Sequence, residues 1–381
     1  GSGVPKPDFL MIPCAKFRGC LLAALAGDCL GAQFEFSPRR SSFRTVWLAF
    51  DANMRERRRW PLVYTDDTAL TRAVCESLVD CRGRVEPASL ARSLTDAYFK
   101  ATDRGYGAAA GGVFEDLRDA NFADPFGPAA ALFEGRGSYG NGGAMRAAPL
   151  GLIGAAAAAA PNAEEVHLAT RVTHSNALAL AGARLMAAAV RLALRFDGVD
   201  VDRLYDSLAA EAAAADTACG LHEGEASSYT SSMRQVKEFL GKHPASSAVD
   251  EEARAVAGAL GTEVTALRSV PTAIYCALRT LRPSHRVHPL ISEWQPPGNQ
   301  NPSIDEALSI EQRQQQQRLL DCLTFAVSLG GDTDTIASMA GAIVGAALGA
   351  DALPASLMLA CEASDAVDSL ATRLHRVAYS S

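Results

Sequence analysis

The sequence predicts an all-α protein in which about a dozen or more helices form one compact domain. Apolar residues recur three and four positions apart almost throughout the chain, whereas few stretches alternate between apolar and polar residues as strands do. Residue types that favour helix starts precede several of these periodic stretches. With 381 residues and an apolar content of 48%, the chain can bury a sizeable core.

The first predicted helix carries two acidic residues on an otherwise apolar surface. Asp28 and Glu35 are seven positions apart, which is two helical turns, so we expect both carboxyl groups on one face of this helix. A carboxyl group that is buried on such a face needs a partner, and a metal ion is one candidate.

The next two predicted helices have recognisable first turns. One begins at Thr65-Asp66-Asp67-Thr68, and its later residues Leu70 and Leu78 share an apolar face. The other begins at Pro87, because proline is favoured at the first helical position. Asp and Thr are ordinary capping residues, so capping alone explains the start at Thr65.

A glycine-rich stretch, residues 135–143, precedes an alanine-rich helix that we expect to begin at Ala144. Glycines can turn backbone N–H groups toward an anion at a helix start, which suits a phosphate or a diphosphate. The stretch lacks the ending of a P-loop and the preceding strand of a dinucleotide fingerprint, so a flexible loop is the alternative. Phe133 and Tyr139 flank the stretch, either to enclose an adenine ring or to lie in the core.

The second half of the chain continues the helical pattern. Asn162 and Glu165 have the spacing of a capping box at a helix start, and residues 274–281 repeat the apolar periodicity. The proline- and glutamine-rich segment 284–317 interrupts the pattern, so we expect a surface insertion between two helices there. A further helix is predicted to begin at Asp332-Thr333-Asp334-Thr335.

The domain organisation follows from the lack of any other linker-like segment or fixed repeat. We predict a single domain over residues 17–381 that carries the insertion 284–317. Residues 1–16 are interpreted as a tag scar, Gly1-Ser2-Gly3, followed by an N-terminal tail. A monomer is expected.

Composition narrows the classes of partner. The net charge of −7 without a basic stripe argues against nucleic-acid binding through phosphate neutralisation. The apolar stretch 151–160 is mostly alanine and too short to span a membrane, so no membrane partner is expected. Nine cysteines without a Cys-x-x-Cys pair indicate free thiols in a reducing, intracellular compartment.

The two acidic helix starts, one toward each end of the chain, are the strongest functional signal. Capping needs one side chain, yet together these starts place four anions at positive helix ends, and such repulsion usually needs a cation to balance it. The four carboxyl groups belong to Asp66, Asp67, Asp332 and Asp334. Mg²⁺ prefers carboxylate and hydroxyl oxygens, whereas Zn²⁺ prefers Cys and His, which neither cluster contains. We therefore expect a magnesium site, with more than one ion, in a cleft where both helix starts meet.

Six runs of residues resemble the ADP-ribosylhydrolase family, and within it the branch that removes ADP-ribose from serine. They are Phe17-Arg18-Gly19-Cys20 with Gly27-Asp28, Tyr64-Thr65-Asp66-Asp67-Thr68, Asp103-Arg104-Gly105-Tyr106-Gly107, Gly137-Ser138-Tyr139-Gly140-Asn141-Gly142-Gly143-Ala144-Met145-Arg146, Ser269-Val270-Pro271-Thr272-Ala273-Ile274-Tyr275-Cys276 and Ser328-Leu329-Gly330-Gly331-Asp332-Thr333-Asp334-Thr335. The resemblance extends from about Phe17 to the C-terminus, interrupted by the insertion 284–317.

The resemblance implies an all-α ADP-ribosylglycohydrolase fold with a binuclear Mg²⁺ centre, two ions per chain. The implied metal ligands are Glu35 on a movable loop, Thr65, Asp66, Asp67, Asp332, Asp334 and Thr335. The implied substrate contacts are Asp66, Gly105, Gly107, Phe133, Arg136, Gly137, Ser138, Tyr139, Gly140, Asn141, Gly142, His174 and Val264. His174 would hold the diphosphate with the glycine-rich loop, although a lone histidine is more often a core or helix-end residue. Arg136 departs from the family pattern, which has Lys there, and keeps the positive charge.

The implied reaction is metal-assisted hydrolysis of the O-glycosidic bond of ADP-ribosyl-serine, with Glu35 or Asp66 as the catalytic base. The implied substrates are serine-ADP-ribosylated proteins, poly(ADP-ribose) and O-acetyl-ADP-ribose, in the cytoplasm, the nucleus and the mitochondrial matrix, within the DNA damage response. The alternatives are an arginine-directed hydrolase and a catalytically silent ADP-ribose binder. Magnesium-dependent terpene or phosphoester chemistry is disfavoured, because the residues after Asp67 lack the downstream acid of a DDxxD motif.

Overall fold

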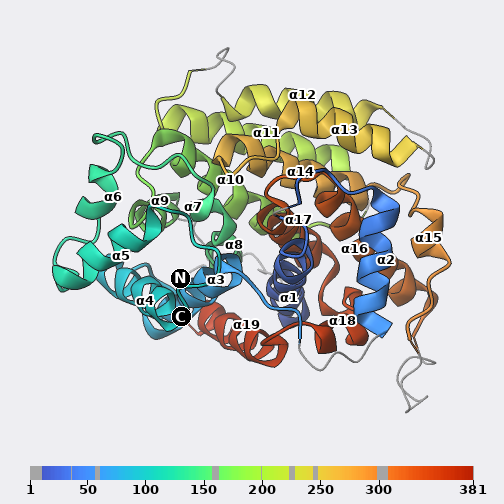
Figure 1. Cartoon of the computed structure of the whole chain (residues 1–381), viewed down its shortest axis with the longest axis horizontal. Helices are drawn as coiled ribbons and strands as arrows, with labels where there is room; N and C mark the ends of the chain where they lie inside the picture. Colours follow the sequence, from blue (N-terminus) through green and yellow to red (C-terminus); the bar gives the residue numbers. More distant parts are fainter. Residues whose placement is uncertain are drawn as a thin grey trace, which may run out of the picture.

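Helices are the regular structure of the described part of the chain, which contains no strand, and this confirms the predicted all-α class. A computed structural model describes residues 11–35, 37–55, 61–156, 163–198, 200–222, 228–242, 248–297 and 308–380. Within these ranges there are nineteen α-helices, one 3-10 helix and no strand (Figure 1). The helices are α1 (Cys14–Gly31), α2 (Phe43–Arg55), α3 (Asp66–Asp80), α4 (Pro87–Lys100), α5 (Ala110–Asp119), α6 (Gly127–Ala131), α7 (Gly142–Met145), α8 (Ala148–Ala156), α9 (Ala163–Arg171), α10 (Ala177–Leu194), α11 (Val201–Ala218), α12 (Tyr229–Gly241), α13 (Val249–Leu260), α14 (Ala266–Leu281), α15 (Pro289–Ser292), α16 (Ile310–Ser328), α17 (Thr333–Leu348), η2 (Ala350–Ala352), α18 (Ala355–Ala360) and α19 (Ser364–Tyr379).

Helices α1 and α17 form the centre of the molecule, although they lie near opposite ends of the chain (Figure 1). Both helices are rich in Ala, Leu and Gly over their whole circumference, and almost every residue of α17 is buried. A helix that is apolar on all sides is stable in water only when other helices surround it. The periphery therefore forms around this pair, with α16 and α14 against α17 and with α19 against α1.

Small residues allow α1 and α17 to pack with their backbones in contact. A Cβ atom at Gly19 would lie 2.5 Å from the Gly345 carbonyl oxygen, and one at Gly27 would lie 2.3 Å from the Ala337 carbonyl oxygen. At the end of α1, a Cβ atom at Gly31 would lie 2.4 Å from Asp334 Cα. Because contacts late in α1 meet residues early in α17, the helices run antiparallel. The C-terminus of α1 is thereby fixed beside the first turn of α17.

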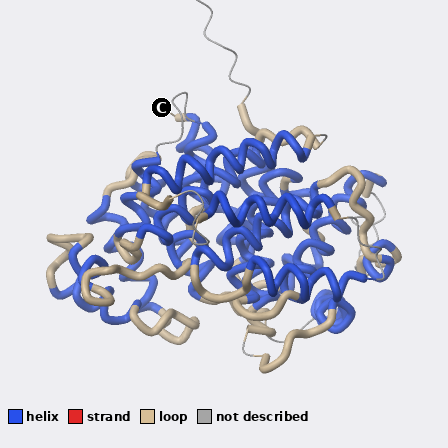
Figure 2. The backbone as a smooth tube through the Cα atoms, turned by 90° about the horizontal axis from the view of Figure 1, so that it is seen from above, coloured by secondary structure: helices blue, strands red, loops and turns tan. Residues whose placement is uncertain are grey.

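Helix α10 is the core of the neighbouring helical layer and packs against α8, α9, α11, α14 and α17. By length and composition, with a mean hydropathy of 1.7, it is the one described helix that could cross a membrane. Because 72% of α10 is buried inside the protein, its apolar character is explained by core packing. Seen from above, the described backbone consists of helices joined by loops (Figure 2).

Two helix boundaries beside the acidic clusters and the glycine-rich stretch differ from the predictions. Helix α1 ends at Gly31, so Glu35 lies in the following turn, and the prediction that Asp28 and Glu35 share a helical face is wrong. The glycine-rich stretch leads first into the single turn α7, and the alanine-rich helix α8 begins only at Ala148.

Of two further helix starts, the start of α4 agrees with the prediction and the start of α16 does not. Helix α4 begins at Pro87 as predicted. Helix α16 begins at Ile310, inside the segment that was predicted to be an insertion, and it includes the glutamine-rich run. Part of that segment, residues 298–307, lies outside the described residues, as does the predicted cap at Asn162. The extent of the insertion stays a prediction.

A buried ionic network joins α13, α14 and α16. Arg279 Nε donates to Glu252 Oε1 at 2.8 Å, and its Nη1 donates to Asp321 Oδ2 at 3.0 Å. His285 Nε2 also lies 3.0 Å from Asp321 Oδ2. Although burial opposes ionisation, the bonds from His285 and the charge of Arg279 lower the pKa of Asp321 to about 2. This carboxylate is therefore ionised and fully paired in the folded protein.

The close contact of α1 and α17 predicts that an alanine substitution inside the contact destabilises the protein, whereas the same substitution on an exposed helix surface does not. Gly345→Ala would place a Cβ atom 2.1 Å from the Gly19 carbonyl oxygen, and we expect overpacking of this kind to cost about 1–3 kcal/mol of unfolding free energy, or more. The matched control is Gly258→Ala, in the exposed part of α13, where no atom lies within 4 Å of the new methyl group. That control should be neutral or stabilising by up to about 1 kcal/mol.

Urea unfolding followed by circular dichroism measures both changes. Equal effects of the two substitutions would contradict the proposed backbone contact.

Candidate metal centre and cleft

The first acidic helix start is held in place by a buried aspartate of α1. Thr65 is the N-cap residue of α3, and its side chain accepts a hydrogen bond from the Asp67 N–H. Asp28, which has no exposed surface, accepts bonds from the N–H groups of Thr65 (2.9 Å) and Thr68 (3.0 Å). Asp28 therefore satisfies the free amides at the start of α3 from a neighbouring helix. Asp66 and Asp67 remain available for other partners.

The second acidic helix start is anchored by two glycines, one backbone hydrogen bond and one side-chain hydrogen bond. Gly330 and Gly331 have φ values of +77° and +74°, which only glycine adopts readily, and they turn the chain into α17. The Asp332 N–H then donates to the Thr262 carbonyl oxygen at 2.8 Å. Asn141 Nδ2 donates to Asp332 Oδ2 at 2.6 Å, which ties the glycine-rich loop to the acidic cluster.

The two acidic starts meet, as the sequence predicted. Thr335 Oγ1 donates to Asp67 Oδ2 at 2.9 Å, across 268 residues of sequence. The other carboxyl oxygen, Asp67 Oδ1, is buried and has no hydrogen-bond partner among the described residues. A buried carboxylate oxygen without a partner is energetically costly, and a cation is a chemically suitable partner for it.

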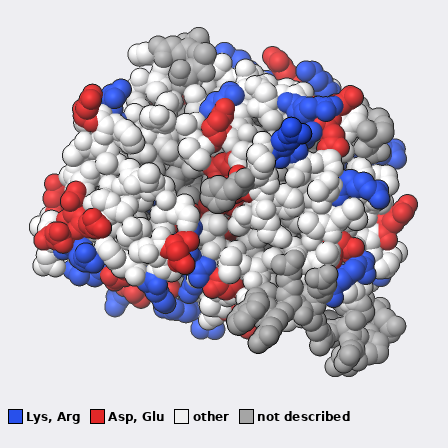
Figure 3. Space-filling model, viewed as in Figure 1, with Lys and Arg blue, Asp and Glu red and all other residues white. Residues whose placement is uncertain are grey.

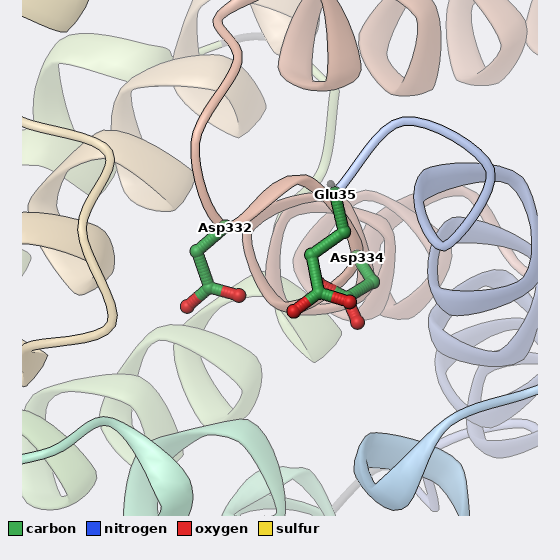
Figure 4. A group of neighbouring side chains, drawn as sticks. All are labelled: Glu35, Asp332 and Asp334. Carbon is green, nitrogen blue, oxygen red and sulfur yellow. The ribbon is translucent and has the colours of Figure 1, made fainter. Parts of the chain in front are cut away.

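Three carboxyl groups lie close enough to share one metal ion. Glu35, Asp332 and Asp334 each offer an oxygen, and these oxygens all lie within 4.8 Å of one another. Figure 4 shows the three carboxyl groups turned to the same side, with Glu35 coming from the turn after α1 and the two aspartates from the start of α17. The donor set contains oxygen only, which fits a hard divalent cation. This cluster can therefore hold a metal ion.

Burial and mutual repulsion raise the pKa values of the clustered carboxyl groups. Burial raises the pKa of Asp66 to about 8, and the neighbouring Asp334 and Asp28 contribute to the rise. Glu35 is half-buried, and its pKa is raised to about 7 by burial and by Asp334 and Asp28. Burial also raises the pKa values of Asp67 and Asp332 well above their ordinary range.

No described Lys or Arg side chain forms an ion pair with Glu35, Asp66, Asp67, Asp332 or Asp334. This differs from Asp321, whose pKa is lowered by its cationic partners. The charge arrangement thus favours a bound cation over structural ion pairing.

A cavity of about 590 Å³ opens beside the acidic cluster. Its wall includes apolar side chains of Leu70, Val113, Phe114, Leu132 and Met145. Figure 3 shows acidic side chains near the middle of this face, surrounded largely by uncharged residues. A cavity with apolar walls and a few convergent polar groups is the usual form of a small-molecule site.

Two aromatic rings stand at the mouth of the cavity. Phe133 is 49% exposed and Tyr139 is 50% exposed, so the alternative that they are core residues is wrong. Their ring centroids are 6.3 Å apart and their planes are inclined by 33°. Phe133 and the adjacent Glu134 have φ values of +53° and +60°, an uncommon conformation for residues other than glycine. This backbone conformation presents the Phe133 ring outward.

The glycine-rich loop is fastened to the start of α14. The Asn141 N–H donates to the Val264 carbonyl oxygen at 2.9 Å, and the Ala266 N–H donates to the Tyr139 carbonyl oxygen at 3.1 Å. The Gly140 N–H donates to Ser138 Oγ at 3.2 Å. These three hydrogen bonds hold the loop in a defined conformation. Two loop amides, those of Gly140 and Asn141, are already used within the protein.

His174 lies beside this loop, and two residues that the sequence analysis did not select surround it. The imidazole Nδ1 is 2.7 Å from Thr173 Oγ1, and Arg146 Nη2 donates to the same oxygen at 2.7 Å. Both Arg146 and Thr173 line the cavity. Arg146 ends one of the runs that carry the family resemblance, but a single arginine between apolar helices has no periodic signature that would mark it as a site residue.

The structure brings most of the predicted site residues to one cavity. Its wall includes Glu35, Asp66, Gly105, Gly107, Phe133, Ser138, Tyr139, Gly140, Asn141, Gly142, His174, Val264, Asp332, Asp334 and Thr335. Thr65 and Asp67 lie behind this wall and contact it through their hydrogen bonds. Arg136 and Gly137 are not part of the wall. The Arg136 side chain is 74% exposed and its Nε donates to the Phe133 carbonyl oxygen, so the substrate contacts of these two residues stay predictions.

A family model and individual relatives of known name both identify one family for this chain. The ADP-ribosylglycohydrolase family model matches residues 11–381. The chain is 37% identical to human ADP-ribosylhydrolase ARH3 over 376 residues, which cover 95% of this chain and 93% of the relative. It is 34% identical to the zebrafish (Danio rerio) ADP-ribosylhydrolase ARH3 over 368 residues, with coverage of 95% and 90%.

A solved structure has the same fold. It is described as an ADP-ribosylglycohydrolase-related protein complex and superposes with a TM-score of 0.60, covering 96% of this chain and 98% of the other. The sequences are 24% identical, so this likeness bears on the fold alone. The family model over nearly the whole chain and the relatives above 30% identity establish the assignment. This chain belongs to the ADP-ribosylglycohydrolase family.

Proposed function

We propose that this protein hydrolyses the O-glycosidic bond of ADP-ribosyl-serine in a metal-dependent reaction and releases ADP-ribose. The observation that carries the proposal is the oxygen-only acidic cluster, built from two distant helix starts, beside a cavity of about 590 Å³ with an aromatic pair at its mouth. Family membership and the ADP-ribosylhydrolase relatives support ADP-ribosyl hydrolysis in general. Poly(ADP-ribose) and O-acetyl-ADP-ribose present the same ADP-ribose unit and are proposed as further substrates.

The proposed metal is Mg²⁺, with two ions per chain. The unpaired Asp67 Oδ1 and the cluster of carboxyl oxygens without cationic partners support this fit. The proposed ligands are Glu35, Thr65, Asp66, Asp67, Asp332, Asp334 and Thr335. Bound divalent ions supply Lewis-acid stabilisation and lower the pKa of water.

Different residues of the cavity wall are proposed to contact the adenine, the diphosphate and the distal ribose of ADP-ribose. Phe133 and Tyr139 are spaced to contact an adenine ring at the mouth. His174 and the loop around Gly140 are placed for the diphosphate, and Asp66 lies deeper, beside the acidic cluster, for the distal ribose. This arrangement directs the anomeric carbon toward the carboxyl groups.

Glu35 is the proposed base that accepts a proton from the attacking water. Its carboxyl group lines the cavity, lies outside any helix, and forms no hydrogen bond with the described residues. A half-buried carboxyl group in this position can accept a proton from water bound in the cavity. Asp66 is the alternative base, since it borders the same space. The departing serine oxygen needs a proton, because charge develops on it as the bond breaks.

The cavity wall favours a serine-linked over an arginine-linked substrate. Apart from the acidic cluster, the wall formed by the described residues contains no carboxylate that could pair with a guanidinium leaving group. Residues 107–110 and Val113, which also line the cavity, are uncharged. The intact set of acidic residues also disfavours a silent binder.

The substrate proposal predicts release of ADP-ribose from a serine-linked peptide with Mg²⁺ and no release in EDTA. An arginine-linked peptide of the same sequence context should release at least tenfold less. Liquid chromatography of free ADP-ribose measures both. Preferential release from arginine would move the protein to the arginine-directed branch, and binding without release from either peptide would support the silent binder.

Glu35→Gln should reduce kcat by about 100-fold or more, because general-base catalysis typically contributes 10² to 10⁴. In EDTA, thermal stability should not fall, since the carboxyl group supports no described hydrogen bond. Glu76→Gln, on the exposed face of α3, is the matched control and should keep full activity. A large fall in melting temperature with normal turnover would contradict the assignment of Glu35.

The metal proposal predicts opposite effects of one substitution with and without Mg²⁺. In EDTA, Asp334→Asn should raise the melting temperature, because it removes one repulsive charge from the cluster. With Mg²⁺ at 100 times its Kd, wild-type protein should gain about 2.7 kcal/mol of stability, and the variant should gain little. Differential scanning fluorimetry reports both, with Asp351→Asn as an exposed control. Equal stabilisation of both proteins by Mg²⁺ would argue against Asp334 as a ligand.

A further inference from the structure

A buried arginine beside the cavity has no carboxylate partner. Arg146 is only 2% exposed, and no described Asp or Glu lies within ion-pair distance of it. Its guanidinium instead donates to the Gly142 carbonyl oxygen at 2.8 Å and to Thr173 Oγ1 at 2.7 Å, with a longer contact to the Ala169 carbonyl oxygen. The charge of Asp66 acts on Arg146 only from beyond ion-pair distance. A buried cation without an ion-pair partner is costly, so a role in the neighbouring site needs to be considered.

The hydrogen-bond directions around Thr173 follow from the chemistry of the donors. A guanidinium group has no acceptor, so Thr173 Oγ1 must accept the bond from Arg146. The threonine hydroxyl still has one proton to donate. Among the described residues its acceptor is His174 Nδ1, at 2.7 Å. If Nδ1 carried a proton instead, two donors would face Oγ1 and the buried hydroxyl proton would have no partner.

We propose that Arg146 and Thr173 are positioning residues that fix His174 as the neutral tautomer with its proton on Nε2, so that an N–H donor faces the diphosphate in the cavity. This inference rests on the proposed function only for the identity of the ligand. The direction of the bonds is a property of the protein alone.

The placement of the imidazole ring agrees with this inference. A Cβ atom at Gly142 would lie 2.6 Å from His174 Cε1, so the ring packs directly on this glycine. On the same edge, Nε2 would be 3.3 Å from a Cβ atom at Gly140, in the loop that lines the cavity. Nε2 forms no hydrogen bond with the described residues. Its N–H is therefore available to a ligand.

The charge state of His174 supports the same conclusion. Burial, together with the adjacent Arg146, lowers the pKa of His174 to about 3. The imidazole is then neutral throughout the physiological range, and exactly one ring nitrogen carries a proton. A neutral N–H donor binds an anion through a directed hydrogen bond, so the correct tautomer matters more than the charge.

The chain provides a matched control for the threonine hydroxyl. Thr170 lies one turn earlier at the end of α9 and is buried like Thr173. Its Oγ1 donates to the Val166 carbonyl oxygen of its own helix at 2.7 Å and takes no part in the contacts of His174. Thr170→Val and Thr173→Val thus make the same chemical change at two buried sites, of which only one contacts the imidazole.

The first experiment observes the imidazole directly in ligand-free protein. Nitrogen NMR of protein labelled with ¹⁵N-histidine distinguishes a protonated from an unprotonated ring nitrogen, and His174→Gln identifies the signals of His174. We expect a protonated Nε2 and an unprotonated, hydrogen-bonded Nδ1. In Thr173→Val the Nδ1 signal should move to the position of a nitrogen without a hydrogen bond, and Thr173→Ser should restore it. A protonated Nδ1 in the wild type, or an unchanged Nδ1 signal in Thr173→Val, would overturn the proposal.

The second experiment measures ADP-ribose affinity by isothermal titration calorimetry. Thr173→Val should weaken binding about 2- to 12-fold, the effect of one lost neutral hydrogen bond. Thr173→Ser should bind like the wild type, and so should Thr170→Val. Equal affinities of Thr173→Val and the wild type would show that the tautomer is not used in binding, which would also overturn the proposal.

The two experiments separate this inference from the proposed function. If wild-type protein does not bind ADP-ribose, the proposed function fails, and the NMR result alone decides whether Arg146 and Thr173 set the tautomer. If wild-type protein binds ADP-ribose and Thr173→Val has no effect on either measurement, the proposed ligand stands and the inference fails.

Discussion

The close packing of α1 against α17 is the constraint on which the site depends. Four successive turns of α1 present glycine or alanine to α17, so the two backbones touch and cannot slide along each other. Their antiparallel direction brings Gly31, the last residue of α1, against Asp334 in the first turn of α17. Thr333 Oγ1 completes the junction by donating to the Gly31 carbonyl oxygen at 2.9 Å. The turn that carries Glu35 therefore begins at a fixed distance from the aspartates of α17.

Because this junction fixes the positions of the acidic side chains, several carboxyl groups lie close together without Lys or Arg partners among the described residues. Two buried aspartates show the contrast, because burial opposes ionisation in both. Asp321 is paired with Arg279 and His285, and its pKa is lowered to about 2. Asp66 faces other carboxyl groups, and its pKa is raised to about 8. The fold thus stabilises one carboxylate for structure and leaves another to be stabilised by a ligand, at a cost that the surrounding helix packing must offset.

The sequence predicted the features that depend on local pattern or on charge density. The helices follow from periodicity, and the meeting of the acidic helix starts follows from the improbability of four unbalanced anions. The end of α1 at Gly31 was missed, because apolar periodicity does not stop there and the cause is the approach of Asp334. Arg146 was missed for a related reason. Its importance comes from a hydrogen bond to Thr173. The two residues are 27 positions apart, so local sequence spacing cannot indicate this contact.

The contact between α1 and α17 has a consequence for how the chain emerges from the ribosome. Gly31 and Thr333, which meet at the junction, are separated by 302 residues. At roughly 5–20 residues per second, α1 waits on the order of tens of seconds for its partner. During that time a segment that is apolar on all sides has no native surface to cover it. Synthesis of this protein therefore exposes an early aggregation-prone segment, and holding chaperones at the nascent chain are the natural protection for it.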